Sequence, residues 1–216
     1  MKTTLLITFL ISSVGSVFGQ GAIQWGNSLT GFRAPIYGAD PANLVITSGQ
    51  SALGIPTGST VYGGPLLQGT RYTFAVYIGP AGATSSQLIL LTSTTFRTAS
   101  GDVLPAGLVI GGTLTVPGVD AGEPALFQIR VWDNKGGTVL DWPSAQTADT
   151  LFGFSPLVLS APLGGIPPGG GAPVITPSTT GWNSFCFTFV PEPTAFALAG
   201  LGVFALALSH RRARRV

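Results

Sequence analysis

The residue types that most often carry catalysis are scarce in this chain of 216 residues. Its only histidine, His210, lies among arginines near the C-terminus, and its only cysteine is Cys186. A Ser-His-Asp or Cys-His arrangement therefore cannot be assembled in the body of the chain, and neither can a zinc site built on histidine and cysteine. The glycines accompany prolines and turns and form no phosphate loop followed by Lys-Ser/Thr. We expect no cofactor.

Carboxylates are the catalytic groups that remain. A glycosidase places two of them about 5 to 10 Å apart across the sugar bond, and Asp133 and Asp141 flank a predicted hairpin. Two structural roles compete, because Asp133 can shape the turn while Asp141 caps a strand end or faces water. A calcium site on Asp133, Asn134 and backbone carbonyls is a further alternative, although Asp-x-Asp ligand spacing is missing. We favour the structural roles and predict no catalytic residue and no metal ligand.

Aromatic side chains offer a different site, a platform on which sugar rings stack. The candidates are Trp25, Trp132, Trp142 and Trp182, with Tyr37, Tyr62, Tyr72 and Tyr77. In the alternating run 125–132, Trp132 falls on the face opposite Phe127, Ile129 and Val131, which makes it the best candidate for a glycan contact. An outward tryptophan is also often covered by a loop or a second sheet. A glycan-binding module therefore stays an alternative.

Short strands must position these residues. Apolar and polar residues alternate most clearly over 71–78, 125–132 and 183–189, and more weakly over 22–25, 44–47, 88–92, 108–110 with 113–116, and 139–142. Turn residues such as 133–137 separate the runs, 160–180 is a proline-rich loop, and 147–151 can hold one helical turn. The pattern lacks βαβ alternation and predicts an all-β fold, an antiparallel β-sandwich of jelly-roll or immunoglobulin-like type, with Cys186 as a small buried hydrophobe.

The N-terminus has the features of a signal peptide. Lys2 precedes an apolar stretch over 5–14, and the small residues of Val17-Phe18-Gly19 fit signal-peptidase cleavage after Gly19. We therefore predict a signal peptide over 1–19 and a mature chain that begins at Gln20. The alternatives are an uncleaved N-terminal anchor and a helix of a protein core. The ten apolar residues are too few to span a bilayer, which favours cleavage.

The C-terminus has the features of a membrane anchor. Pro191, Glu192 and Pro193 lead into sixteen uncharged residues, 194–209, and a basic tail over 210–216 follows. A helix of that length reaches about 24 Å against a hydrocarbon core of about 30 Å, so it spans only marginally. The tail acts as a stop-transfer signal and stays in the cytoplasm. Its arginines are Arg211, Arg212, Arg214 and Arg215. The preceding domain, 20–189, is thus predicted to be exported.

The charge of the exported domain argues against nucleic acid as a partner. The whole chain carries a net charge of +2 and has a pI near 9.0. Between residues 20 and 189, however, five basic residues stand against seven acidic ones, which gives −2. The basic residues of that domain form no run or patch. A nucleic-acid partner is therefore not expected.

The C-terminal residues, Val190-Pro191-Glu192-Pro193-Thr194 with the apolar segment and terminal arginines, resemble the PEP-CTERM sorting domain of bacterial surface proteins. The resemblance covers 190–216. It implies Sec export, a transient inner-membrane anchor, recognition of the Pro-Glu-Pro segment by an exosortase, and transfer to the cell surface or extracellular matrix. Two prolines keep this segment extended, as a cleaving enzyme requires. The alternative is a simple linker to a permanent anchor.

A looser similarity concerns the exported domain. Its Gln128-Ile129-Arg130-Val131-Trp132-Asp133 segment and the later Gly153-Phe154-Ser155 resemble ectodomains that carry this tail in Verrucomicrobia-like bacteria. We predict a surface-destined, non-enzymatic protein with a structural or adhesive role among extracellular polysaccharides. The alternatives are a glycan-binding module and a carbohydrate-active enzyme that uses paired carboxylates.

Overall fold

A computed structural model describes residues 19–39, 64–98, 106–148 and 150–187. The elements, in chain order, are β1 (Gln20–Gly26), β2 (Ser28–Leu29), β3 (Phe32–Arg33), β4 (Tyr72–Pro80), η1 (Ser85–Gln87, a 3₁₀ turn), β5 (Ile89–Thr95), β6 (Ile110–Asp120), β7 (Ala125–Asp133), α1 (Trp142–Thr147), β8 (Phe152–Phe154) and β9 (Val158–Leu159). All paired strands are antiparallel, which confirms the predicted all-β class.

The larger sheet has the order β5-β4-β7-β8, and β9 pairs with β7 beside β8. β4 and β7 are its centre and pair along their whole length, with Val76 opposite Ile129. Because side chains alternate between faces, Phe74 and Val76 of β4 share one face with Ile129 and Val131 of β7. These four side chains are fully buried, so the predicted strands at 71–78 and 125–132 are confirmed.

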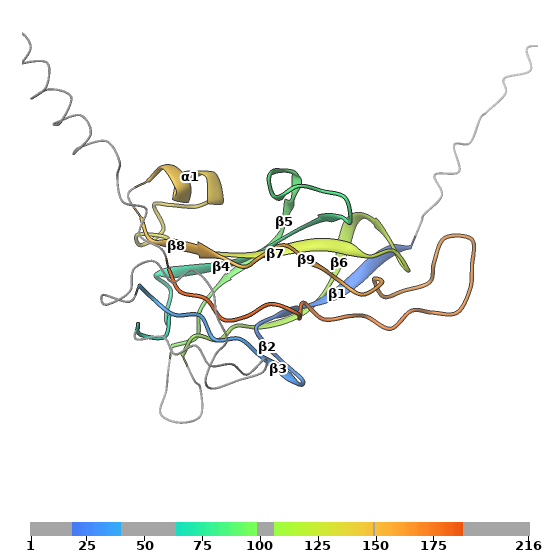
Figure 1. The fold of residues 1–216 in the computed structure, drawn as a ribbon, viewed down its shortest axis with the longest axis horizontal. Coiled ribbons are helices and arrows are strands. Elements are labelled where there is room, and N and C mark those ends of the chain that lie inside the picture. The colour runs from blue at the N-terminus through green and yellow to red at the C-terminus, as the bar shows by residue number, and fades with distance from the viewer. Residues whose placement is uncertain (1–18, 40–63, 99–105, 149, 188–216) are drawn as a thin grey trace, which may run out of the picture.

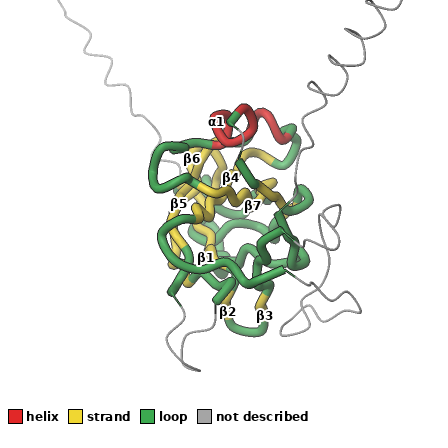
Figure 2. The backbone as a smooth tube through the Cα atoms, turned by 90° about the vertical axis from the view of Figure 1, so that its left-hand side faces the viewer, coloured by secondary structure: helices red, strands yellow, loops and turns green. Residues whose placement is uncertain are grey.

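A second sheet, formed by β1 and β6, covers that apolar face. Ile23 and Trp25 of β1 and Val116 of β6 join the same core as Phe74, and the rings of Trp25 and Phe74 lie 6.3 Å apart. β6 runs continuously where two shorter strands were predicted. The core thus lies between two antiparallel layers, with β1, β2 and β3 on one side of β4 and β7 and α1 on the other (Figure 2).

The outer face of the larger sheet is covered as well. Tyr77, Trp132, Trp142 and Phe152 form a second buried apolar cluster between this face and α1. The predicted strand at 139–142 is wrong, because α1 begins at Trp142. Asp141 accepts a hydrogen bond from the backbone N–H of Ser144, and a proline stands in the first turn. Both features are typical of a helix N-terminus.

The end of the described chain does not form the strand predicted over 183–189. Over its described residues it makes a single bridge, between Cys186 and Tyr37. Phe185, Cys186 and Phe187 are each fully buried, so successive side chains here do not alternate between a buried and an exposed face. Residues 160–180 form the predicted loop, which lies along β1 and extends past its start (Figure 1).

Several predictions concern residues outside the described ranges. These are the signal peptide apart from Gly19, the strand at 44–47, the Pro-Glu-Pro segment, the membrane helix at 194–209 and the basic tail. Within the described ranges, no helix is long and apolar enough to cross a bilayer.

Candidate functional site

Asp133, the first predicted catalytic carboxylate, is fully engaged in the fold. Its Oδ2 accepts hydrogen bonds from Arg71 Nε at 2.9 Å and Nη2 at 2.7 Å, and its Oδ1 accepts from the backbone N–H of Lys135 at 2.9 Å. The Asp133 side chain is 4% exposed, whereas that of Arg71 is 67% exposed. Asp133 therefore joins the end of β7 to the start of β4 and shapes the following turn.

Asp141, the second predicted carboxylate, caps α1. Its Oδ1 accepts the backbone N–H of Ser144 at 2.8 Å, and hydrogen bonds from Ser144 hold the pKa of this carboxyl below its usual range. The general acid of a glycosidase needs the opposite shift, toward a raised pKa. The geometry of both carboxylates thus serves the fold.

The turn after β7 uses the groups that a calcium ion would need. Asn134 Oδ1 accepts the backbone N–H groups of Gly136 and Gly137 at 3.0 and 3.1 Å, and Asn134 Nδ2 donates to the Thr70 carbonyl at 2.8 Å. In the described part of the chain, no three His, Cys, Asp or Glu side chains gather as metal ligands do.

Trp132 does not provide the exposed ring that a glycan contact requires. It lies on the outer face of the sheet, as predicted, but is only 1% exposed. Its Nε1–H donates to the Val139 carbonyl at 3.0 Å, and its ring packs edge-on against Trp142 at 6.2 Å. The segment that leads into α1 covers it, which the period of the strand alone does not reveal.

Sequence analysis assigned no role to Arg130, which is 5% exposed. Its Nε–H donates to Gln128 Oε1 at 2.9 Å, and its Nη2 donates to the Ser85 carbonyl at 2.5 Å. Burial is the main cause that lowers the pKa of Arg130 and raises the pKa of the adjacent Tyr77. The groups that contact the Arg130 guanidinium, namely the Gln128 side chain, the Ser85 carbonyl and the Tyr77 ring, are all uncharged.

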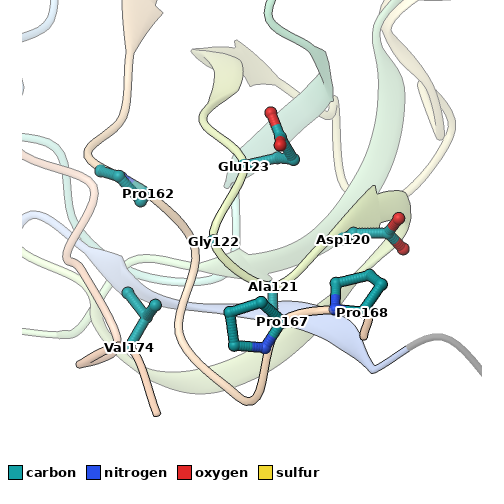
Figure 3. A pocket seen from close by; sticks show the side chains of 8 residues that line it. All are labelled: Asp120, Ala121, Gly122, Glu123, Pro162, Pro167, Pro168 and Val174. Atoms are coloured by element: carbon teal, nitrogen blue, oxygen red, sulfur yellow. The ribbon is translucent and has the colours of Figure 1, made fainter. Parts of the chain in front are cut away.

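A shallow pocket of about 620 Å³ lies at the turn between β6 and β7. Pro162, Pro167 and Val174 form one side of it, whereas Asp120 ends β6 and Glu123 lies in the turn that follows (Figure 3). The carboxylates of both acidic residues point away from Val174 in this view. The pocket therefore presents mainly apolar walls and no converging polar groups.

The last described residue is tightly held. The backbone N–H of Phe187 donates to the Tyr37 carbonyl at 3.1 Å, and its ring lies 5.6 Å from that of Tyr72. The sorting triplet begins only four residues later, at Pro191. The segment that carries the signal therefore leaves the domain from a fixed point.

Comparison with known families gives a match over residues 189–212, to the PEP-CTERM protein-sorting motif. The match includes the predicted sorting triplet and two of the four predicted stop-transfer arginines, Arg211 and Arg212, and ends before the other two. No curated protein and no solved structure matches the chain. The resemblance to the sorting motif is thus confirmed, and the Verrucomicrobia-like type is not.

Proposed function

We propose that this chain is a surface or extracellular-matrix protein with a structural or adhesive role, delivered by its C-terminal sorting signal. The observation that carries the proposal is the PEP-CTERM match over 189–212, which marks an exported protein sorted through its C-terminus and implies exosortase processing. The finer steps are signal-peptidase cleavage after Gly19, anchoring by 194–209, and removal of the tail near Pro191–Pro193. The domain then remains among extracellular polysaccharides.

The described domain supports a non-enzymatic role. Asp133 is ion-paired to Arg71, and Asp141 caps α1. We assign its two antiparallel layers to a β-sandwich of jelly-roll or immunoglobulin-like type. The fold itself does not decide between binding and catalysis, so the proposal depends on the structural roles of these two carboxylates.

The intact mass of the protein from the surface of its native host tests the delivery. A mass that lacks residues 1–19 and everything after the Pro-Glu-Pro region supports sorting and release. A matched variant with alanine at Pro191, Glu192 and Pro193 should retain the mass of the four terminal arginines. If the unaltered protein also retains them, it stays in the membrane and the matrix role is wrong.

A sugar-release assay tests the non-enzymatic assignment. The purified domain should release no reducing sugar from the host polysaccharide. A real activity that disappears in both Asp133→Asn and Asp141→Asn would replace this proposal with a carbohydrate-active enzyme. Stability must be measured in parallel, because both carboxylates hold the fold together.

A further inference from the structure

The exit point of the chain limits the distance between the domain and a membrane. Phe187 is fully buried and fixed against Tyr37 and Tyr72. The predicted membrane helix begins at Thr194. Six residues separate the two, so seven steps of the backbone span at most about 25 Å when fully extended. Two prolines in this stretch, Pro191 and Pro193, also reduce its freedom to bend back.

The turn after β7 lies at the same end of the domain. Tyr72, which contacts Phe187, is paired in register with Asp133. The backbone N–H of Asn134 donates to the Arg71 carbonyl at 2.8 Å, and that of Val139 donates to the Asn134 carbonyl at 3.0 Å. We call this surface, formed by Arg71, Tyr72 and residues 133–140, the exit end.

The exit end carries a prominent apolar side chain. Leu140 is 78% exposed, although it follows the buried Val139 directly. Lys135, at the tip of the turn, is exposed and has a φ of 48°, the only positive value among the described non-glycine residues. Arg71 and Lys135 are balanced by Asp133 and by Asp141, which directly follows the exit end, so this surface carries no marked net charge and Leu140 is its prominent exposed group.

The opposite end of the domain carries a comparable exposed side chain. Gln20 pairs with Asp120 there, and the 160–180 loop extends beyond them at the right of Figure 1, whereas β8 and α1 lie at the left. Ile175 of this loop is 89% exposed. It provides a matched reference for Leu140, because both are large, apolar and exposed.

We propose that, in the membrane-anchored precursor, the exit end rests on the lipid headgroups with Leu140 inserted in the interface. The inference rests on the proposed function, since it requires 194–209 to lie in the bilayer. A single leucine binds membranes weakly, but the short tether gives it a high effective concentration at the surface, so a weak contact is populated. The balanced charges make the contact independent of salt.

Fluorescence in vesicles tests the contact. The full chain, carrying Leu140→Cys or Ile175→Cys and an environment-sensitive dye on the new thiol, is reconstituted in phosphatidylcholine/phosphatidylglycerol vesicles. Cys186 is fully buried, and the parent protein serves as the labelling control. Emission at position 140 should shift to the blue and be quenched by nitroxide lipids, at low and high salt alike. Emission at position 175 should resemble that of the dye in water.

Flotation of the vesicles distinguishes a missing membrane anchor from a missing lipid contact at Leu140. Protein that does not float overturns both the anchor and the lipid contact. Protein that floats while position 140 is no more quenched than position 175 overturns the contact alone and leaves the anchor intact. Quenching at position 140 that is lost in high salt also overturns it, because the attraction would then be electrostatic.

Discussion

The guanidinium carbon of Arg130 lies 4.1 Å from the ring centroid of Tyr77 and 5.2 Å from that of Trp142. An almost fully buried cation is thus held by two aromatic faces and by the oxygens of Gln128 and Ser85. This side chain joins β7 to η1 and α1. It explains how the outer face of a central strand accommodates a charge.

The contact between Arg130 and Tyr77 predicts how the Tyr77 hydroxyl titrates at alkaline pH. Burial raises the pKa of Tyr77 above its usual value of 10.0, and the positive charge of Arg130 opposes that rise. Arg130→Met should therefore raise the pKa of Tyr77 further. Tyrosinate absorbance against pH, with Tyr77→Phe subtracted, measures it. A lower pKa in a folded Arg130→Met protein would contradict the contact.

The Tyr77 hydroxyl also makes the stability of the protein depend on pH, and the direction of this dependence follows from its raised pKa. Because the folded state disfavours tyrosinate, the stability linked to Tyr77 is complete below pH 10.0, the usual value, and is lost as the pH rises through the raised folded pKa. Urea midpoints should fall more steeply above pH 10 in the unaltered protein than in Tyr77→Phe. Equal slopes would show that Tyr77 ionises as freely in the folded state as in the unfolded state.

Trp142 is the centre of the outer aromatic cluster, with rings of Trp132, Phe152 and Phe154 at 6.2, 5.3 and 5.9 Å. We expect Trp142→Ala to lower the free energy of unfolding by about 3–5 kcal/mol, because it leaves a cavity beneath α1. Emission from Trp132 should shift to the red as water reaches it. The exposed neighbour Leu140, changed to alanine, should alter stability by less than about 0.5 kcal/mol. Similar losses in both variants would show that α1 does not cover this cluster.

The capping role of Asp141 predicts that the protein loses stability at acid pH. Hydrogen bonds from Ser144 hold its pKa below the usual 3.8, so the stability it contributes is present above that value and is lost as the pH falls through the folded pKa. Asp141→Asn keeps a capping oxygen without the titration. The difference in urea midpoint between the two proteins should therefore change below pH 4 and stay constant above it. A constant difference throughout would mean that the carboxylate does not cap α1 in solution.

Strands with an alternating pattern were the predictable part of the fold. β4 and β7 begin and end within two residues of the predicted runs, because both alternate over their whole length. The strand predicted over 139–142 is wrong because the apolar residues of this stretch hide the helix-start signal of Asp141 and Pro143. The strand predicted over 183–189 is wrong for another reason, because the backbone there bridges to Tyr37, which lies far away in the sequence.

The sorting signal could be predicted from contiguous residues, whereas the burial of the outer cluster depends on segments that fold over it. This signal is recognisable because the Pro-Glu-Pro triplet, the apolar segment and the basic residues follow one another in the sequence, and the family match over 189–212 confirms it. Trp132 was predicted correctly to lie on the outer face of β7, and Arg130, two residues earlier in the strand, lies on the same face. Their burial depends on α1 and η1, which fold back from other parts of the chain. A strand period specifies the face of a sheet but not what covers that face.

Two adjacent glycines in β6 give the sharpest test of the sheet that β6 forms with β1. A Cβ added to Gly111 would overlap the backbone oxygen and ring of Trp25, whereas one added to Gly112 would meet nothing within 4 Å. Gly111→Ala should therefore force the strands apart and lower the free energy of unfolding by about 1–3 kcal/mol. Gly112→Ala restricts the unfolded chain and should be neutral or stabilising by about 0.5 kcal/mol. Equal urea midpoints for the two variants would mean that β1 and β6 do not approach each other at Trp25 as closely as the structure shows.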